Sequence, residues 1–326
     1  MHAAIRSGLL GWTLSFRQDI PKPKFDPSKS PRDVLLDVQS AAINPIDYKL
    51  PRLVGGTIFG LDVSGTVQAI GSEVTEFSVG DQVFGTASTG SLAQYAVAKV
   101  DRIAKKPDFL SFREAAALPI AYVTGLQALR DAGKIGNQFK EETGGSVLVI
   151  GASGGCGIAG VQLAKALGVK RIVGVCSAKN ADFVREAGAS EVVDYNEQDG
   201  MEDFFSKNRG KFDCVYDTAT GSGKKEDYTD RSIPLLTEAG EYVQINGGPS
   251  VWAKKMMGGK SERRTLVLTD INRSNLEAVS SLLEGSGARP HVNEMPFTEK
   301  GVNDGFDLLK SRRTKGKIVF DVGSVS

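Results

Sequence analysis

The chain has 326 residues, of which 40% are hydrophobic and 24% are charged, and its formal net charge is +1 at pH 7. The composition is that of a soluble globular protein, and the length favours two domains. A nearly neutral chain has no excess of basic charge to attract nucleic acid or an anionic membrane, so neither is expected as a partner.

No membrane or targeting segment is visible in the sequence. No apolar run approaches the ~20 residues that span a bilayer, and the first twenty residues lack the apolar core of a signal peptide. We therefore expect no membrane span and a cytoplasmic location. The alternative is a plastid or mitochondrion, reached through a signal that the sequence does not reveal.

The first 120 residues contain short runs rich in Val, Ile, Gly and Pro, which predict a β-rich, barrel-like module with little helix. The clearest strand candidates are 33–43, 62–71 and 94–106. The pattern changes at Ser111, which is followed at the third helical position by Glu114. This spacing is the capping-box signature and predicts that a helix begins there.

From Val147 onward, apolar runs alternate with amphipathic segments, including a helix predicted near 229–238. This alternation is typical of βαβ units and predicts a parallel sheet covered by helices on both faces. The last apolar run, 316–322, is more like the N-terminal module. We therefore expect a discontinuous first domain, residues 1–121 and 273–326, and a nucleotide-binding domain, residues 122–272.

A glycine-rich turn lies between a predicted strand and a predicted helix. It is a variant of the GxGxxG fingerprint, with Ala152 in the first glycine position. Glycines allow close approach to a pyrophosphate, and the helix N-terminus offers N–H groups to it. The alternative is a tight turn that binds no ligand. The candidate pyrophosphate loop is Ser153, Gly154, Gly155, Cys156 and Gly157.

The end of the next predicted strand indicates which dinucleotide is bound. NAD-binding chains commonly carry Asp or Glu there, whereas residues 171–180 contain no acid and the first one, Asp182, lies in the following helix. Ser177 can donate a hydrogen bond to a 2′-phosphate, and Lys179 supplies positive charge. We therefore predict NADPH as the cofactor, the alternative being that Lys179 is only a solvated residue.

Cysteine and histidine are scarce, with three and two residues. The sequence contains no CxxC pair, no HExxH motif and no His/Cys cluster. The usual zinc ligands are therefore missing from the pattern, and we expect no metal.

In these features and in the segments below, the chain resembles the zinc-independent quinone oxidoreductases of the medium-chain dehydrogenase/reductase superfamily. Within this family it is similar to plant chloroplast-envelope quinone oxidoreductase homologues and to alkenal/oxoene reductases. The resemblance implies an α/β fold with a GroES-like β-rich barrel domain and a Rossmann domain with a doubly wound parallel sheet. The matching segments, in order, are 44–49, 60–67, 77–81, 115–129, 151–157, 188–195, 212–219 and 316–322.

The resemblance also implies roles for individual residues. Thr124 and Asn246 are expected near the nicotinamide half of the cofactor. Ser177, Lys179 and Tyr195 are expected to hold the adenosine 2′-phosphate. Relatives are often dimers, joined by extension of the nucleotide sheet across a two-fold axis, so a homodimer is expected.

Asn44 takes the position at which zinc-containing relatives place a metal-binding cysteine. Without zinc, hydride must go to a substrate that is already electrophilic, such as a quinone or an α,β-unsaturated carbonyl. The candidate catalytic residues are Tyr48, Asn44 and Lys49. Alternatively, Lys49 pairs with Asp47, and Asn44 and Asp47 only hold a loop in place.

A second hypothesis is an NADPH-binding regulatory or structural module with little catalytic activity. It depends on the loop after Lys49, which is shorter than in the relatives and contributes to the substrate pocket there. A zinc alcohol dehydrogenase is a third and more distant alternative.

Overall fold

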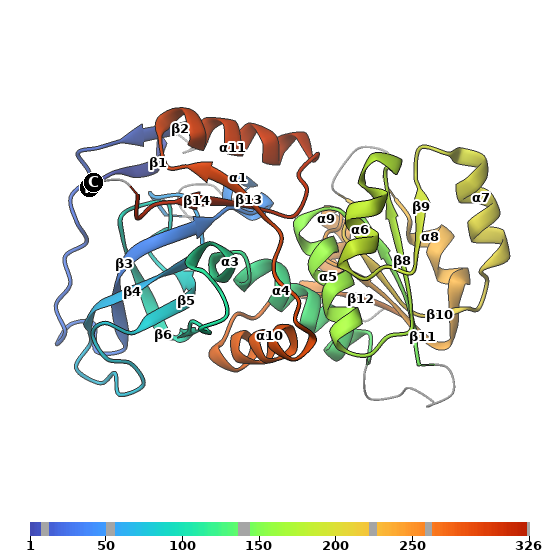
Figure 1. Cartoon of the computed structure of the whole chain (residues 1–326), viewed down its shortest axis with the longest axis horizontal. Helices are drawn as coiled ribbons and strands as arrows, with labels where there is room; N and C mark the ends of the chain where they lie inside the picture. Colours follow the sequence, from blue (N-terminus) through green and yellow to red (C-terminus); the bar gives the residue numbers. More distant parts are fainter. Residues whose placement is uncertain (8–12, 50–55, 136–143, 222–226, 258–262, 325–326) are drawn as a thin grey trace. The chain divides into compact units, whose positions relative to one another are not determined.

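The computed structural model describes residues 1–324 apart from the segments 8–12, 50–55, 136–143, 222–226 and 258–262 (Figure 1). The chain forms two compact units. The first comprises Met1–Ile120, Ile271–Ser280 and Arg289–Ser326, and the second comprises Ala121–Asp270 and Ser281–Ala288. The chain thus leaves the first unit and later returns to it.

A six-stranded sheet is the framework of the first unit. Its strand order is β13-β14-β3-β4-β5-β6, and β3 also pairs with β6, which closes β3 to β6 into a barrel. β13 and β14 pair in parallel, whereas β14 runs antiparallel to β3. The strands are β3 (Asp33–Ala42), β4 (Asp62–Ile70), β5 (Gln82–Ala87), β6 (Tyr95–Lys105), β13 (Val292–Pro296) and β14 (Lys317–Asp321).

Two further strands and three helices of this unit pack around the barrel. They are the hairpin strands β1 (Ala3–Ser7) and β2 (Thr13–Arg17), and the helices α1 (Pro45–Lys49), α3 (Phe112–Ala116) and α11 (Glu299–Ser311). Phe306 of α11 is buried, and its ring centroid lies 5.1 Å from that of Phe59. Burying each such side chain stabilises the unit by about 1.5–3 kcal/mol.

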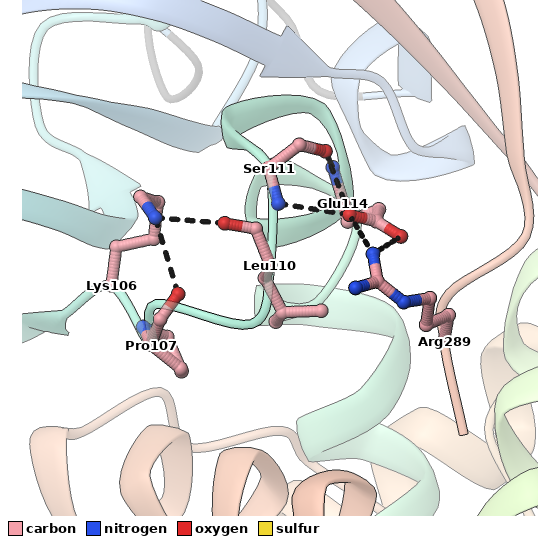
Figure 2. A network of polar contacts seen from close by, with 6 residues as sticks. All are labelled: Lys106, Pro107, Leu110, Ser111, Glu114 and Arg289. Atoms are coloured by element: carbon pink, nitrogen blue, oxygen red, sulfur yellow. Dashed lines mark hydrogen bonds and ion pairs between the residues drawn. The ribbon is translucent and has the colours of Figure 1, made fainter. Parts of the chain in front are cut away.

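The helix predicted at Ser111 is α3, and its capping box is confirmed (Figure 2). Glu114 N donates to Ser111 Oγ at 3.3 Å, and Ser111 N donates to Glu114 Oε2 at 2.8 Å. Arg289, where the chain re-enters the first unit, donates to Glu114 Oε1 at 2.8 Å. Lys106 at the end of the barrel donates to Leu110 O at 2.7 Å. The residues before and inside α3 are therefore tied to the first and the last of the three chain segments of the unit.

An entirely parallel six-stranded sheet forms the framework of the second unit (Figure 1). Its order is β12-β11-β10-β7-β8-β9. Successive strands are added outward from β7 in one direction as far as β9, and then outward from β10 in the opposite direction, so the strand order reverses between β7 and β10. In such sheets, ligands bind beyond the carboxyl ends of the strands at this reversal. The strands are β7 (Ser146–Ile150), β8 (Arg171–Cys176), β9 (Glu191–Asp194), β10 (Phe212–Asp217), β11 (Leu236–Gln244) and β12 (Arg264–Leu266).

Helices connect these strands, and one prediction about them is wrong. The predicted helix near 229–238 is only α8 (Thr229–Ser232) and a 3-10 turn (Ile233–Leu235), because Leu236 already pairs with Phe212 as the start of β11. The other helices between the strands are α5 (Gly155–Ala166), the 3-10 turn Ala178–Asn180, α6 (Ala181–Ala187), α7 (Gln198–Lys207) and α9 (Pro249–Met256). Before the sheet come α4 (Pro119–Leu126), which begins in the first unit, and its π-helical continuation (Gln127–Ala132); after the sheet comes α10 (Arg273–Ser286), which also begins in the first unit.

The predicted fold class is therefore confirmed, with a barrel-forming sheet in one unit and a parallel sheet with helical connections in the other. Among the described residues, no helix combines the length and apolarity needed to cross a membrane.

Candidate functional site

The glycine turn lies between β7 and α5, at the point where the sheet order reverses. Gly151 has a φ of +78°, which favours glycine. A Cβ at Gly157 would lie 2.1 Å from Gly151 O, so the helix can approach the turn only without a side chain there. A Cβ at Gly154 would meet nothing nearer than Gly151 O at 3.6 Å. The turn therefore has no room for a side chain at Gly157, whereas the space beside Gly154 is open.

The N-terminus of α5 is suited to an anion. Gly154 is the N-cap and provides no side-chain hydrogen bond, and Gly155 is the first helical residue. The helix packs on β7 and β8, so its N-terminal end lies at the carboxyl edge of the sheet. Helix N-termini of this kind bind phosphate through backbone N–H groups and the helix dipole. The predicted loop, Ser153 to Gly157, therefore leads into a helix N-terminus that no side chain caps, and its role as a phosphate site stays a prediction.

The residues predicted to contact a 2′-phosphate meet at the end of β8. Ser177 is 7% exposed and precedes the 3-10 turn, in which Lys179 is exposed. Tyr195 follows β9 and is 51% exposed. Its backbone N–H donates to Cys176 O at 3.2 Å, which places it beside the residue that precedes Ser177. The structure therefore brings these three predicted residues to one edge of the unit.

A carboxylate that sequence reasoning missed lies at the same place. Asp194 pairs with Cys176 across β8 and β9. Its Oδ1 accepts hydrogen bonds from Asn196 N at 2.9 Å and Asn196 Nδ2 at 2.8 Å. These bonds, mainly the one from the backbone N–H, and a further one from Ala178 N lower its pKa. The sequence carried a signal for this carboxylate: Asp194 ends the predicted strand after β8, and neighbouring parallel strands have their carboxyl ends at the same edge of the sheet.

β10 is the neighbour of β7 at the point where the strand order reverses, and its last residue is Asp217. Asp217 is 1% exposed, and its Oδ1 accepts from Ala219 N at 2.8 Å and Thr220 N at 2.9 Å. Its Oδ2 accepts from Tyr242 Oη at 2.5 Å. Asp217 therefore shapes the backbone that follows β10, a role that sequence reasoning also missed.

Two predicted nicotinamide-side residues have defined contacts within the second unit. Asn246 lies after β11, and its Nδ2 donates to Thr218 O at 3.4 Å. Thr124 on α4 is 3% exposed, and its Oγ1 lies 2.6 Å from Thr269 Oγ1. Gln127 reinforces the same contact, because its Nε2 donates to Asp270 O at 2.9 Å. These bonds hold α4 to the segment after β12.

Asn44, in the first unit, is a buried part of a polar network rather than an exposed side chain. It is 4% exposed. Its Nδ2 donates to Asp62 Oδ2 at 2.9 Å, and its Oδ1 accepts from Lys317 Nζ at 2.6 Å. Its backbone N–H donates to Asp47 Oδ2 at 2.7 Å. These contacts favour the alternative in which Asn44 and Asp47 hold the segment in place.

Lys317 and Asp62 are the centre of this network, and neither was singled out from the sequence. Lys317 Nζ donates to Ile43 O at 3.1 Å and to Asp62 Oδ2 at 3.0 Å. Asp62 Oδ1 accepts from Ile120 N, in the first turn of α4, at 3.1 Å. The network therefore joins β14, the end of β3, the start of β4 and the start of α4.

Asp47 is the buried residue of α1. Burial raises the pKa of its carboxyl to about 7, although the hydrogen bond from Asn44 N and the nearby Lys317 and Arg6 act in the opposite direction. Arg6 Nη2 donates to the backbone Asp47 O at 2.6 Å, and its guanidinium carbon lies 4.2 Å from the Phe59 ring centroid. Arg6 thus holds the backbone of α1 in place through this hydrogen bond.

Tyr48 and Lys49 project from the helix that this network anchors. Tyr48 is half-buried against the barrel core, whereas Lys49 is exposed. Partial desolvation and the positive charge of Arg312 lower the pKa of Lys49. Within the described part of the chain, no ion pair joins Lys49 to Asp47, so that alternative has no contact to support it. Most of the short loop that follows, 50–55, lies outside the described residues.

No group of three or more His, Cys, Asp or Glu side chains in the described residues has an arrangement that holds a metal ion. The three candidate catalytic residues belong to the first unit, and the ten candidate cofactor residues belong to the second.

Comparison with known proteins identifies the family. Residues 30–108 match the alcohol dehydrogenase GroES-like domain, and residues 187–320 match a family described as zinc-binding dehydrogenase. A chloroplastic quinone-oxidoreductase homologue from Spinacia oleracea is 33% identical over 341 residues, which cover 98% of each chain. The chain belongs to the medium-chain dehydrogenase/reductase superfamily. Within this superfamily it is quinone-oxidoreductase-like, as the sequence resemblance predicted.

Two further relatives agree with this assignment. A chloroplastic NADPH-dependent alkenal/one oxidoreductase from Arabidopsis thaliana is 29% identical over 88% of this chain and 71% of its own length. The structure of the quinone oxidoreductase from Coxiella burnetii is 28% identical, covers 99% of both chains and superposes with a TM-score of 0.79. The barrel unit is therefore GroES-like, and the parallel-sheet unit is Rossmann-like.

Proposed function

We propose that this member of the superfamily is an NADPH-dependent oxidoreductase that transfers a hydride to a quinone or an α,β-unsaturated carbonyl. The observation that carries the cofactor assignment is the edge where Ser177, Lys179 and Tyr195 meet beside the glycine turn. The similarity to quinone and alkenal/one oxidoreductases supports the class of substrate.

The second unit would hold the cofactor. Gly154 and the N-terminus of α5 bind the pyrophosphate, and Lys179 and Ser177 bind the 2′-phosphate by charge and hydrogen bonding. The Asp194 carboxylate accepts several N–H groups there, which partly offsets its charge. Thr124 and Asn246 border the nicotinamide half. When bound, NADPH supplies the hydride.

The first unit would provide the substrate contacts. A quinone or enone places developing negative charge on an oxygen, and a donor aimed at that oxygen stabilises the transition state. Tyr48 has an apolar ring for packing and a hydroxyl that can donate to it. Lys49, the next residue on α1, adds positive charge that would stabilise the negative charge on the same substrate oxygen. Asn44 acts through these residues, because its amide is engaged by Asp62 and Lys317 and it fixes the start of α1.

An assay of NADPH oxidation with a panel of quinones, short enals and cyclic enones tests the proposal. We expect turnover with at least one class, and a much lower rate with NADH at equal concentration. Tight NADPH binding without turnover of any compound would overturn the enzyme assignment and favour an NADPH-binding module. Stoichiometric zinc in the purified protein would instead favour a zinc alcohol dehydrogenase.

We also propose a homodimer formed through the parallel sheet. In the described residues, β12 pairs on one side only, with β11, and so presents an open edge. Light scattering on the purified protein should give twice the mass of one chain. A monomeric mass at micromolar concentration would contradict this.

A further inference from the structure

One buried hydrogen-bond acceptor in the second unit has no donor in the described protein. Asn180 ends the 3-10 turn after β8 and is 7% exposed. Its Nδ2 donates to Ser153 Oγ at 3.0 Å, which ties this turn to the glycine loop. Its Oδ1 is buried and has no hydrogen-bond partner.

Asn180 does not serve as a helix cap, although it stands at the N-cap of α6. An asparagine at this position ordinarily accepts a hydrogen bond from the first helical turn, but this side chain makes no such bond. Its backbone N–H donates to Ser177 O at 2.8 Å, and its side chain points to Ser153 instead. The local contacts therefore direct the amide to the glycine loop at the expense of capping.

A buried acceptor without a donor is unfavourable, because it has lost water and gained no partner. The residue that carries this oxygen contacts both phosphate sites of the proposed function. Its Nδ2 donates to Ser153 Oγ on the pyrophosphate loop, and its backbone N–H donates to Ser177 O at the 2′-phosphate site. The adenosine ribose connects these two phosphate groups. A ribose offers hydroxyl donors, whereas an ionised phosphate offers none, so a ribose hydroxyl is the complementary group.

We propose that Asn180 Oδ1 accepts a hydrogen bond from the 3′-hydroxyl of the adenosine ribose. The inference rests on the dinucleotide site of the proposed function and adds a residue that sets its cofactor preference. NAD-binding chains commonly use a carboxylate to accept from this ribose. A neutral amide accepts the same hydrogen bond without placing a negative charge beside the 2′-phosphate.

Titration of the full-length protein with NADPH and with NADH tests the inference, with binding read by calorimetry. Asn180→Ala removes the acceptor and should weaken both nucleotides by up to about tenfold, the effect of one hydrogen bond. Asn180→Asp keeps an acceptor but adds charge. It should weaken NADPH by at least about tenfold and leave NADH within about threefold of the original protein.

Asn208→Ala is the matched control. Asn208 is also a buried amide of the second unit, 8% exposed, with Nδ2 donating to Phe204 O at 2.8 Å and Oδ1 accepting from Arg171 Nη2 at 2.8 Å. It should lower the melting temperature and leave both dissociation constants unchanged. Melting curves of all three variants, with and without nucleotide, separate lost binding from lost folding.

The outcomes distinguish the inference from the proposed function. Unchanged binding by a folded Asn180→Ala, or equal losses of NADPH and NADH in Asn180→Asp, would overturn the role of Asn180 alone. An original protein that binds neither nucleotide would overturn the dinucleotide site and this inference together.

Discussion

Lys317 and Asp62 form a buried ion pair in which Nζ lies 3.0 Å from Oδ2, although 255 residues separate them. Asn44 and the Ile43 carbonyl accept the other two protons of the ammonium. The pair therefore joins the end of the chain to the segment that carries Tyr48 and Lys49.

Replacing Lys317 should be strongly destabilising. Lys317→Met keeps much of the side-chain volume but leaves the Asp62 carboxylate buried without its counter-charge, which typically costs about 3–5 kcal/mol. Urea denaturation, which measures the free energy of unfolding, checks this. The double variant Lys317→Met/Asp62→Asn should recover much of the loss. The control is Lys300→Met, whose ammonium pairs with Asp304 on the surface of α11 and is 84% exposed; equal effects of the two lysine variants would contradict the assignment.

The buried Asp47 should make stability depend on pH. Its pKa in the folded protein is about 7 against 3.8 for an ordinary aspartate, because burial disfavours the charged form. Between these values the folded protein holds a proton that the unfolded chain has released, so stability falls as pH rises through this window and levels off above it. The groups that face this carboxyl are Asp62, Lys317 and Arg6.

The Asp47→Asn variant checks this dependence. It keeps an acceptor for the Asn44 N–H but does not titrate. Melting temperatures measured from pH 5 to pH 8 should fall more steeply for the original protein than for the variant, and the variant should be the more stable at pH 8. Parallel curves would show that Asp47 does not cause the pH dependence.

Two glycines of the same turn should respond differently to alanine. At Gly157 a methyl group would lie 2.1 Å from Gly151 O, so Gly157→Ala must displace the backbone and should lower the melting temperature. Gly154 has a φ of −76° and open space around it, so Gly154→Ala should fold normally. The added methyl group would nevertheless occupy the side from which a pyrophosphate approaches, and NADPH binding should weaken. Normal NADPH affinity in Gly154→Ala would argue against this loop as the phosphate site.

Lys179 should discriminate between the two nucleotides. Lys179→Ala removes a charge that only a 2′-phosphate would use, so the dissociation constant for NADPH should rise about 10-fold to 100-fold while that for NADH stays nearly constant. Fluorescence titration measures both. Lys207→Ala, an exposed lysine of α7 paired with Asp203, is the control and should change neither. Equal losses for both nucleotides would refute the assignment of the 2′-phosphate site.

Local patterns in the sequence predicted much of this architecture. The capping box at Ser111 and Glu114, the glycine turn and the alternation of strands with helices each depend on residues close together in the chain, which is why they are recognisable. The predicted helix over 229–238 failed because Leu236 is recruited into the sheet by pairing with Phe212. That tertiary contact overrides the helical pattern.

The polar contacts of the candidate sites were less predictable. Asn44 was singled out by its position, but its engagement by Asp62 and Lys317 depends on three distant segments meeting. Asp194 was not considered because only the end of β8 was examined for an acid. It is the last residue of the next strand, β9, and it lies beside Cys176, the last residue of β8. Such pairings follow from the order of the strands, and no single segment reveals them.

The return of the chain to its first unit has a consequence for synthesis on the ribosome. All six strands of the Rossmann-like sheet lie between residues 146 and 266, whereas the GroES-like sheet requires β14 at residues 317–321 and the Lys317 ammonium that it carries. Domains generally fold as units while the chain emerges. The unit that begins first in the sequence should therefore be the last to become resistant to protease on a stalled nascent chain.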